Sequence, residues 1–330
     1  MLEPLVTIVV VPRERFSYTQ FSLEGIYAHS DIPFKLIYID GNSPQPIKRY
    51  LEAQSFAKAF HLIRTENYLS PNQARNLALP YIDTKYVVFI DNDVQVTSGW
   101  LNKLVECADE TNASVVGPLY LDGVSTNLET QNIHMAGGFC EFQEQEGKLD
   151  LREHRYFAKN QLSAVKSQLL REATQLIEFH CVLVRTTILK QLGDFDEKLM
   201  SLAEESDFCL TVRTLGETIY LEPASTVIYV LPVPLKLYDL PYFCLRWSDA
   251  WNKASLNHFQ QKWGLAEDAK FMTIGYKWAN RHRLVPLQQI QDVLLNILPW
   301  KFNSKIYLNF RAFMEGILTQ LFVKDKHQKI

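Results

Sequence analysis

The stretch KYVVFIDND, residues 85–93, decides how the rest of this chain is arranged. Its apolar part combines Val, Phe and Ile without alternation, which is typical of a strand buried on both faces. The run ends abruptly in Asp91, Asn92 and Asp93. Ligands of open α/β sheets gather at the carboxyl ends of strands, so we expect a ligand site here. The alternative is a polar turn, because Asp and Asn are ordinary turn residues.

Two carboxylates at a strand end have one obvious use, which is to hold a divalent cation that in turn holds a phosphate. Mg²⁺ and Mn²⁺ prefer oxygen ligands, and Mg²⁺ commonly binds one or two carboxylates together with substrate phosphates. We therefore predict Asp91 and Asp93 as metal ligands. Neither a P-loop nor a glycine-rich dinucleotide loop follows the first apolar run, which disfavours kinases, ATPases and dehydrogenases.

Composition narrows the class of protein. The chain has 330 residues with 34 Lys and Arg against 37 Asp and Glu, so its formal net charge is −3. This balance argues against nucleic acid as the main partner. The five cysteines are widely spaced and form no Cys-x-x-Cys pair, so we expect buried thiols in a reducing compartment. No signal peptide or transmembrane run is visible, and we expect a cytoplasmic protein, with peripheral membrane association left open.

Strands alternating with helices predict an α/β fold with a mostly parallel sheet and helical crossovers. The apolar patterns predict strands at 5–11, 34–39, 60–64, 85–90, 113–121, 176–184, 218–221 and 225–230. They predict helices at 13–30, 45–58, 71–79, 100–111, 187–191, 204–212 and 243–263.

We expect residues 1–230 to form the ligand-binding part, with 141–173 as a flexible flap or insertion because the pattern weakens there. We expect residues 231–330 to form a mainly helical region. This region would serve as an acceptor-binding unit, a dimer contact or a membrane-surface element. The basic residues Lys301, Lys305 and Arg311 are compatible with the last role.

A second acidic cluster consists of Glu204, Glu205 and Asp207 at the start of a predicted helix. Carboxylates at a helix start are stabilised by the helix dipole, which is the purely structural explanation. The functional explanation is a general base that removes a proton from an attacking hydroxyl group. Crowding by other acids raises the pKa of a carboxyl group, which suits that task.

Other side chains allow both a structural and a functional interpretation. His134, next to Gly137 and Gly138, and His180 could serve a ligand or be satisfied structural residues. Four tryptophans of the C-terminal half could form an acceptor platform or pack helices together, and packing is favoured because Trp buries a large area. They are Trp247, Trp251, Trp263 and Trp278.

Three groups of residues, taken in order, resemble family 2 glycosyltransferases of the GT-A fold. They are YIDGNS (38–43), then NQARN (72–76) with YVVFIDND (86–93), and then GDFDE (193–197) with EESDFCLTVR (204–213) and Gly216. The resemblance covers about residues 5–230. It implies an inverting transfer of one sugar from a nucleoside-diphosphate sugar to a saccharide, lipid-linked or protein acceptor.

The resemblance also implies roles for individual residues. Asp40 would contact the nucleobase, Arg75 would lie near the nucleotide, and Asn92 would share the nucleotide site with its neighbours. Asp91 and Asp93 would hold Mg²⁺ or Mn²⁺ on the diphosphate.

The general base is less clearly defined, because this chain has Glu205 where the family usually has Asp. Glu204 and Glu205 both remain candidates, and we favour Glu205, with Glu204 and Asp207 in support. The chain has FCLRW (243–247) where membrane-bound processive relatives carry Gln-x-x-Arg-Trp, so we expect a soluble, non-processive enzyme.

One alternative function is a non-catalytic nucleotide-sugar or glycan-binding protein on the same scaffold. A sugar-phosphate nucleotidyltransferase is disfavoured, because VPRER (11–15) stands where that class has a glycine-rich loop.

Overall fold

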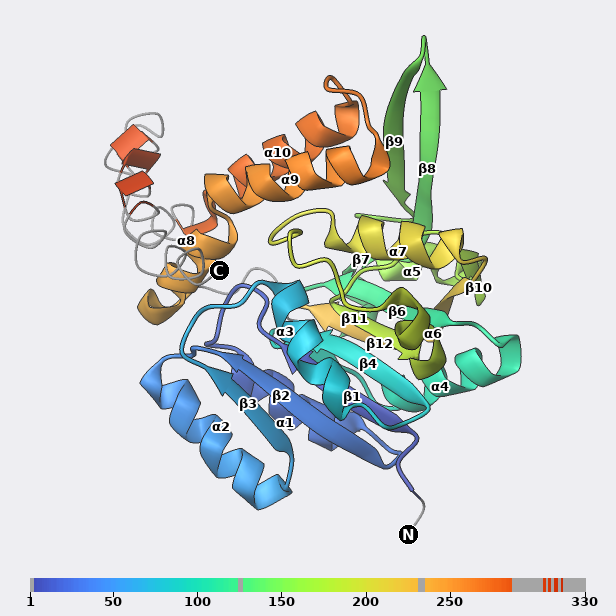
Figure 1. The fold of residues 1–330 in the computed structure, drawn as a ribbon. Coiled ribbons are helices and arrows are strands. Elements are labelled where there is room, and N and C mark those ends of the chain that lie inside the picture. Colours follow the sequence, from blue (N-terminus) through green and yellow to red (C-terminus); the bar gives the residue numbers. More distant parts are fainter. Residues whose placement is uncertain are drawn as a thin grey trace.

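The computed structural model describes residues 3–123, 127–230 and 235–286, together with residues 305, 306, 308, 309, 312, 313 and 316. Ten of the described strands form one sheet, and two more form a separate hairpin. Helices lie on both faces of the large sheet (Figure 1). Within these described ranges, no helix is long and apolar enough to cross a membrane.

The strands, in chain order, are β1 (Val6–Val11), β2 (Phe34–Gly41), β3 (His61–Thr65), β4 (Tyr86–Asp91), β5 (Val94–Val96), β6 (Val115–Asp122), β7 (Asn132–Met135), β8 (Gly138–Gln145), β9 (Lys148–Arg155), β10 (Glu172–Thr174), β11 (Cys181–Arg185) and β12 (Ile219–Tyr229). The α-helices are α1 (Thr19–His29), α2 (Gln45–Lys58), α3 (Pro71–Ala78), α4 (Trp100–Thr111), α5 (Leu162–Val165), α6 (Thr186–Leu192), α7 (Glu204–Thr214), α8 (Leu240–Arg246), α9 (Asp249–Trp263) and α10 (Lys270–His282).

The main sheet has the order β10-β12-β6-β11-β4-β1-β2-β3, with β5 paired to β12 and β7 paired to β6. β3, β2, β1 and β4 run parallel, whereas β11 is antiparallel to both of its neighbours, β4 and β6. The sheet is therefore mostly parallel, as predicted. β1, β2 and β4 all end at the same edge, which brings the polar residues that follow them together.

The sheet centre is the core of the molecule. Every residue of β1 and of β4 is buried, which explains why these two sequences are continuously apolar rather than alternating. α3 packs against β1 and β2, and α4 packs against β6 and β12. The start of α3 is a capping box, in which Ser70 and Gln73 satisfy each other's backbone N–H groups. This cap defines where the helix begins next to the ligand-binding edge.

Several predicted elements have different boundaries. The helix expected at 13–30 begins only at Thr19, because hydrogen bonds from other parts of the chain hold the residues after Pro12 in a loop. The strands expected at 218–221 and 225–230 are one strand, β12, with a register shift between Glu222 and Thr226. The helix expected at 243–263 is divided into α8 and α9, where the Ser248 hydroxyl caps the new helix start.

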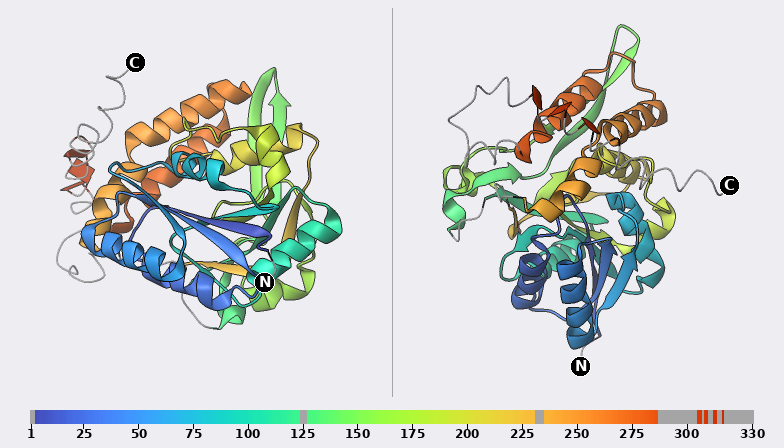
Figure 2. Two further views of the ribbon diagram at one scale, coloured as in Figure 1. Left: turned by 60° about the horizontal axis from the view of Figure 1, so that its bottom comes forward. Right: turned by 90° about the vertical axis from the view of Figure 1, so that its left-hand side faces the viewer.

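The strand expected at 176–184 is shorter, since β11 begins at Cys181. The predicted flap at 141–173 contains the β8–β9 hairpin, which projects from the sheet beside α9 and α10 (Figures 1 and 2). The hairpin is joined to the turn between those helices. Ala266 donates its N–H to the Leu149 carbonyl at 2.8 Å, and the Asp150 carboxylate accepts the N–H of Lys270 at 3.0 Å. Weak apolar patterning here reflects a hairpin with two mostly exposed strands.

The helices after residue 235 share the core of the sheet. Tyr242 and Phe259 are fully buried in the same apolar cluster as β1 and β4. All five cysteines are free thiols, as predicted, and four of them are buried. Lys305 is exposed, whereas Lys301, Arg311 and most of the predicted helical region after residue 286 lie outside the described residues.

Two glycines provide a matched test of this packing. A Cβ at Gly117 in β6 would lie 2.7 Å from Ile177 Cγ2 and 2.9 Å from the Tyr120 hydroxyl oxygen, whereas a Cβ at Gly25 in α1 would meet no atom within 4 Å. We expect Gly117→Ala to lower the free energy of unfolding by about 1–3 kcal/mol through overpacking. We expect Gly25→Ala to raise it by roughly 0.5–1 kcal/mol, because Ala favours the helix. Chemical denaturation of both variants tests this, and equal effects would contradict the packing at Gly117.

Candidate active site at the carboxyl end of β4

Asp91 and Asp93 lie where the direction of chain connections in the sheet reverses. β1 pairs with β2 on one side and with β4 on the other, and Val11 at its end is the register partner of Asp91. Such reversal points are where open α/β sheets bind their ligands. Both aspartate side chains are completely buried. The structure therefore brings the two predicted metal ligands together at the expected edge.

Each aspartate uses one oxygen within the protein and leaves the other free. Asp91 Oδ2 accepts a hydrogen bond from His180 Nδ1 at 2.9 Å, and Asp93 Oδ2 accepts one from Arg15 Nε at 2.9 Å. The two Oδ1 atoms are buried and have no hydrogen-bond partner in the part of the chain that the structure describes. Burial raises the pKa of Asp93 to about 7, against the opposing charge of Arg15. Unpartnered buried oxygens are costly, so this pair fits a divalent cation.

Two arginines directly after β1 face the aspartates. The Arg13 side chain is 9% exposed, and its Nε lies 3.7 Å from Asp91 Oδ2. Arg13 Nε and Nη1 have no hydrogen-bond partner within the described ranges. Arg15 is buried and pairs with Asp93 and Glu14. Neither arginine was predicted to have a role, although basic residues directly after the first strand were the available signal.

Asn92 holds this arginine loop in place. Its side-chain oxygen accepts the N–H of Arg13 at 3.0 Å, and its Nδ2 donates to the carbonyl of Arg15 at 2.8 Å. The backbone N–H of Asn92 donates to the carbonyl of Val11. Asn92 therefore positions the loop, and a direct contact with a nucleotide stays a prediction.

The second acidic cluster divides into residues with different partners. Glu204 is buried and accepts a hydrogen bond from Arg246 Nη2 at 2.6 Å. Asp207 accepts hydrogen bonds from Lys262 Nζ and Trp263 Nε1, both at 2.8 Å. The Glu205 side chain remains 20% exposed, and its carboxylate lies 3.5 Å from Arg13 Nη1. Among the three predicted residues, only Glu205 combines partial exposure with a contact to Arg13, which also lies near Asp91.

The pKa of Glu205 suits proton transfer near neutral pH. Burial and the neighbouring charge of Glu204 raise this pKa to about 7, although Arg13 opposes the shift. A carboxyl group with a pKa near the working pH is an efficient general base.

Arg75 is a buried cation near the carboxylates of Asp91 and Glu204. Its guanidinium group lies 3.7 Å from the centre of the Phe179 ring, and its Nη1 donates to Asn72 Oδ1 at 2.8 Å. Burial lowers the pKa of Arg75 to about 10, while the charges of Asp91 and Glu204 oppose the shift. Nε and Nη2 have no hydrogen-bond partner among the described residues. The side chain is thus buried near the charges of the site, with two nitrogens that have no partner among the described residues.

Asp40 lies at the carboxyl end of β2, on the same edge of the sheet as Asp91. Its carboxylate accepts the N–H of Ser43 at 2.8 Å and the hydroxyl of Ser43 at 3.0 Å, and it forms an ion pair with Arg64. The predicted nucleobase contact would therefore involve a carboxylate that the protein has already oriented.

The C-terminal helices cover the arginine loop. The carboxylate of Glu14 accepts hydrogen bonds from Trp247 Nε1 and His282 Nε2, each at 2.9 Å. Burial raises the pKa of Glu14, but the charges of His282 and Arg15 outweigh burial and hold that pKa below its usual range. Trp247 and Trp251 are buried, as the favoured packing role requires, whereas Trp278 is 40% exposed.

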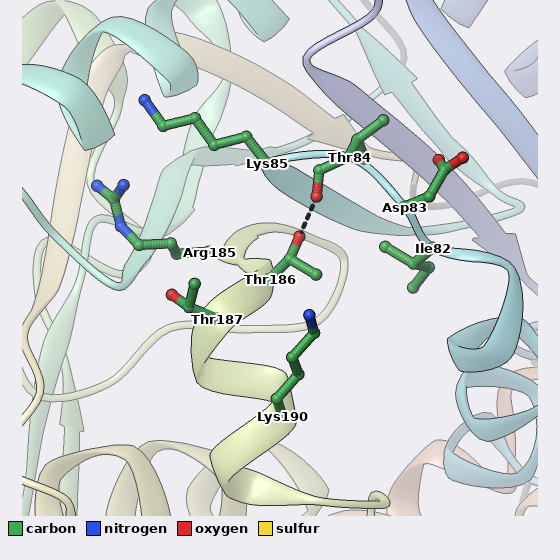
Figure 3. Close-up of a pocket in the computed structure, with 8 residues that line it drawn as sticks. All are labelled: Ile82, Asp83, Thr84, Lys85, Arg185, Thr186, Thr187 and Lys190. Atoms are coloured by element: carbon green, nitrogen blue, oxygen red, sulfur yellow. Dashed lines mark hydrogen bonds between the residues drawn. The ribbon is translucent and has the colours of Figure 1, made fainter.

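A pocket of about 380 Å³ lies at the opposite end of β4 (Figure 3). Lys85, Arg185 and Lys190 line it, and the Thr186 hydroxyl donates to the carbonyl of Thr84 at its base. Strand β4 separates it from Asp91 by roughly 17–20 Å, the usual length of a six-residue strand. This pocket therefore lies away from the predicted site residues.

Comparison with known proteins places the chain in a family. Residues 7–193 match the model of glycosyl transferase family 2. A pre-mycofactocin glycosyltransferase of Mycobacterium tuberculosis, known from two strains, is 24% identical over 198 residues. The match covers 58% of this chain and 37% of that relative, so the chain spans little more than a third of the length of its curated relatives.

Two solved glycosyltransferase structures are similar to the chain, and the first of them supports the shared fold. The structure of GalNAc-T7 with UDP, GalNAc and Mn²⁺ has a TM-score of 0.54 and 14% identity, covering 84% of this chain and 56% of that one. Staphylococcus aureus TarS residues 1–349 with UDP have a TM-score of 0.46 and 15% identity, covering 79% and 72% of the two chains. The predicted α/β fold of the GT-A type is confirmed. By the match over residues 7–193, the chain belongs to glycosyl transferase family 2.

Proposed function

We propose that the chain is an inverting glycosyltransferase that moves a single sugar from a nucleoside-diphosphate sugar to a hydroxyl acceptor. The acceptor would be a saccharide, a lipid-linked saccharide or a protein. The observation that carries the proposal is the pair of buried Oδ1 atoms on Asp91 and Asp93 without hydrogen-bond partners in the described ranges. They lie at and just after the carboxyl end of β4, in a chain that belongs to family 2. The presence of UDP and Mn²⁺ in the GalNAc-T7 structure supports the choice of ligand.

The residues at the end of β4 suit a diphosphate that arrives with a metal ion. Asp91 and Asp93 would hold Mg²⁺ or Mn²⁺, which would stabilise negative charge on the leaving diphosphate. Arg13 Nε and Nη1, which have no hydrogen-bond partner within the described ranges, would donate hydrogen bonds to phosphate oxygens. Side chains would thereby replace the backbone amides that a glycine-rich loop supplies in other nucleotide-binding proteins.

Of the remaining residues, Asp40 would bind the donor and Glu205 would act on the acceptor. Asp40, held by Ser43 and Arg64, would bind the nucleobase at the end of β2. Glu205 would accept the proton of the acceptor hydroxyl as that oxygen attacks the anomeric carbon. Attack from the side opposite the leaving diphosphate would invert the configuration without a covalent intermediate. Glu204 would keep Arg246 in place, and so support Glu205 indirectly.

Replacement of Asp93 tests donor binding. A nucleoside diphosphate with Mn²⁺ should stabilise the wild-type chain by about 2.7 kcal/mol at a ligand concentration 100 times Kd. Asp93→Asn keeps the shape but removes the charge, and should lose the metal-dependent part of this stabilisation. A thermal-shift panel of nucleoside diphosphates, with and without Mn²⁺, measures the effect and identifies the preferred base.

Asp83→Asn is the matched control, since Asp83 is exposed and pairs only with Lys35 in the described structure. It should behave as the wild type does. No stabilisation of the wild type by any nucleoside diphosphate would refute both the transferase and the alternative of a non-catalytic nucleotide-sugar-binding protein.

Replacement of Glu205 separates catalysis from binding. Glu205→Gln should lower kcat by about 10²–10⁴-fold, because the general base is lost, while donor binding persists. With a pKa of about 7 in the wild type, Glu205 is protonated at lower pH. Log(kcat/KM) should therefore fall by about one unit for each pH unit below 7 and level off above it.

The exposed Glu197 supplies the control, because Glu197→Gln should change neither kcat nor the pH profile. Undiminished turnover in Glu205→Gln would rule out Glu205 as the base. Donor binding by the wild type without any transfer or hydrolysis would instead favour the non-catalytic binding protein.

A further inference from the structure

A cluster of two histidines and one glutamate lies directly behind Asp91. His134 comes from β7, whereas Glu178 and His180 precede β11. Each residue can offer one ligand atom, and the three atoms lie within 4.8 Å of one another. Glu178 and His180 are 4% exposed. The Tyr120 hydroxyl donates to the carbonyls of Glu178 and Cys181, which anchors the segment that carries the cluster.

In both imidazole rings, Nδ1 lies against a carboxylate oxygen. His134 Nδ1 lies 2.8 Å from Asp122 Oδ1, and His180 Nδ1 lies 2.9 Å from Asp91 Oδ2. A carboxylate on Nδ1 holds a proton there, so that Nε2 can give its lone pair to a metal ion once Nε2 itself is deprotonated. Metal-binding histidines in proteins are usually held by such a carboxylate on the second nitrogen. In this chain both Nε2 atoms face Glu178.

Two of the three separations are close to those of a site that holds one metal ion, and the third is within 4.8 Å. Zn²⁺ binds imidazole nitrogen and carboxylate oxygen at about 2.0–2.2 Å, so two ligand atoms of a tetrahedral site lie roughly 3.4 Å apart. Glu178 Oε2 is 2.9 Å from His134 Nε2 and 3.8 Å from His180 Nε2. These values lie on either side of the required separation. Shifts of a few tenths of an ångström would equalise them.

An ion-pair network without metal is the competing explanation. Arg155 Nη2 lies 2.6 Å from Glu178 Oε1, and Arg155 Nη1 lies 3.3 Å from His134 Nε2. This arrangement leaves Glu178 Oε2 buried and without a properly oriented hydrogen bond among the described residues. A metal ion would use that oxygen, while Arg155 could keep its ion pair with Oε1.

We propose that His134, Glu178 and His180 form a binding site for a Zn²⁺-type divalent transition metal, distinct from the all-oxygen Asp91–Asp93 pair. Two imidazoles and a carboxylate suit Zn²⁺, whereas Mg²⁺ prefers oxygen ligands, so the two sites would differ in selectivity. The His180 ring would connect them, with Nε2 on the metal and Nδ1 on Asp91. Three protein ligands would leave a coordination position open.

Metal binding to the full chain tests this proposal without any measurement of activity. Co²⁺ substitutes for Zn²⁺ and reports a site of low coordination number through its visible absorption, which should appear at one equivalent in excess Mg²⁺. Competition with Zn²⁺ then gives the Zn²⁺ affinity. We expect His134→Ala, on the half-buried β7, to weaken Zn²⁺ binding by at least 100-fold. Asp122→Asn should weaken it by about 10- to 100-fold, as is usual when a carboxylate behind a histidine ligand is lost.

Two controls complete the design. His154→Ala removes an exposed histidine from β9, and Asp93→Asn removes a carboxylate of the other site; both should keep the Co²⁺ signal and the Zn²⁺ affinity. The proposal is overturned if the Co²⁺ signal is absent, if it survives in His134→Ala, or if it is lost in His154→Ala or Asp93→Asn instead.

Discussion

The surrounding structure depends on one constraint. The buried charges of Asp91 and Asp93 must be compensated by other groups of the protein. Moving a carboxylate out of water costs several kcal/mol unless opposite charges or hydrogen bonds replace the solvent. Here Arg15 pairs with Asp93, and His180 donates to Asp91. Arg13 adds positive charge nearby. The loop after β1 and the segment before β11 are therefore held against the end of β4. Both remain close to the two Oδ1 atoms that lack a hydrogen-bond partner among the described residues.

The same compensation extends to the C-terminal helices. Arg246 on α8 is completely buried against Glu204, and Glu14 is held by Trp247 and His282. Removing one member of a buried ion pair commonly destabilises a protein by about 3–5 kcal/mol. The helices after residue 235 are thus joined to the charged groups of the site as well as to its apolar core. Their packing and the charge balance of the site depend on each other.

The sequence was sufficient to predict the parts of the fold that depend on local pattern. The continuous apolar runs of β1 and β4 predict buried strands, and the polar residues after β4 predict the site at their carboxyl ends. The loop that holds Arg13 could not be predicted in this way, because Asn92 organises it from far along the chain. The cluster of His134 and His180 was also hidden, since β7 and the segment before β11 meet only in the folded sheet.

The most direct test of the account is a crystal structure of the full chain with UDP and Mn²⁺, examined by anomalous diffraction at the manganese edge. We predict a manganese peak between the Oδ1 atoms of Asp91 and Asp93, with the diphosphate bound to the ion and the Arg13 guanidinium group facing its phosphates. A bound nucleotide without manganese at these two carboxylates, or with manganese only at the His134–Glu178–His180 cluster, would contradict it.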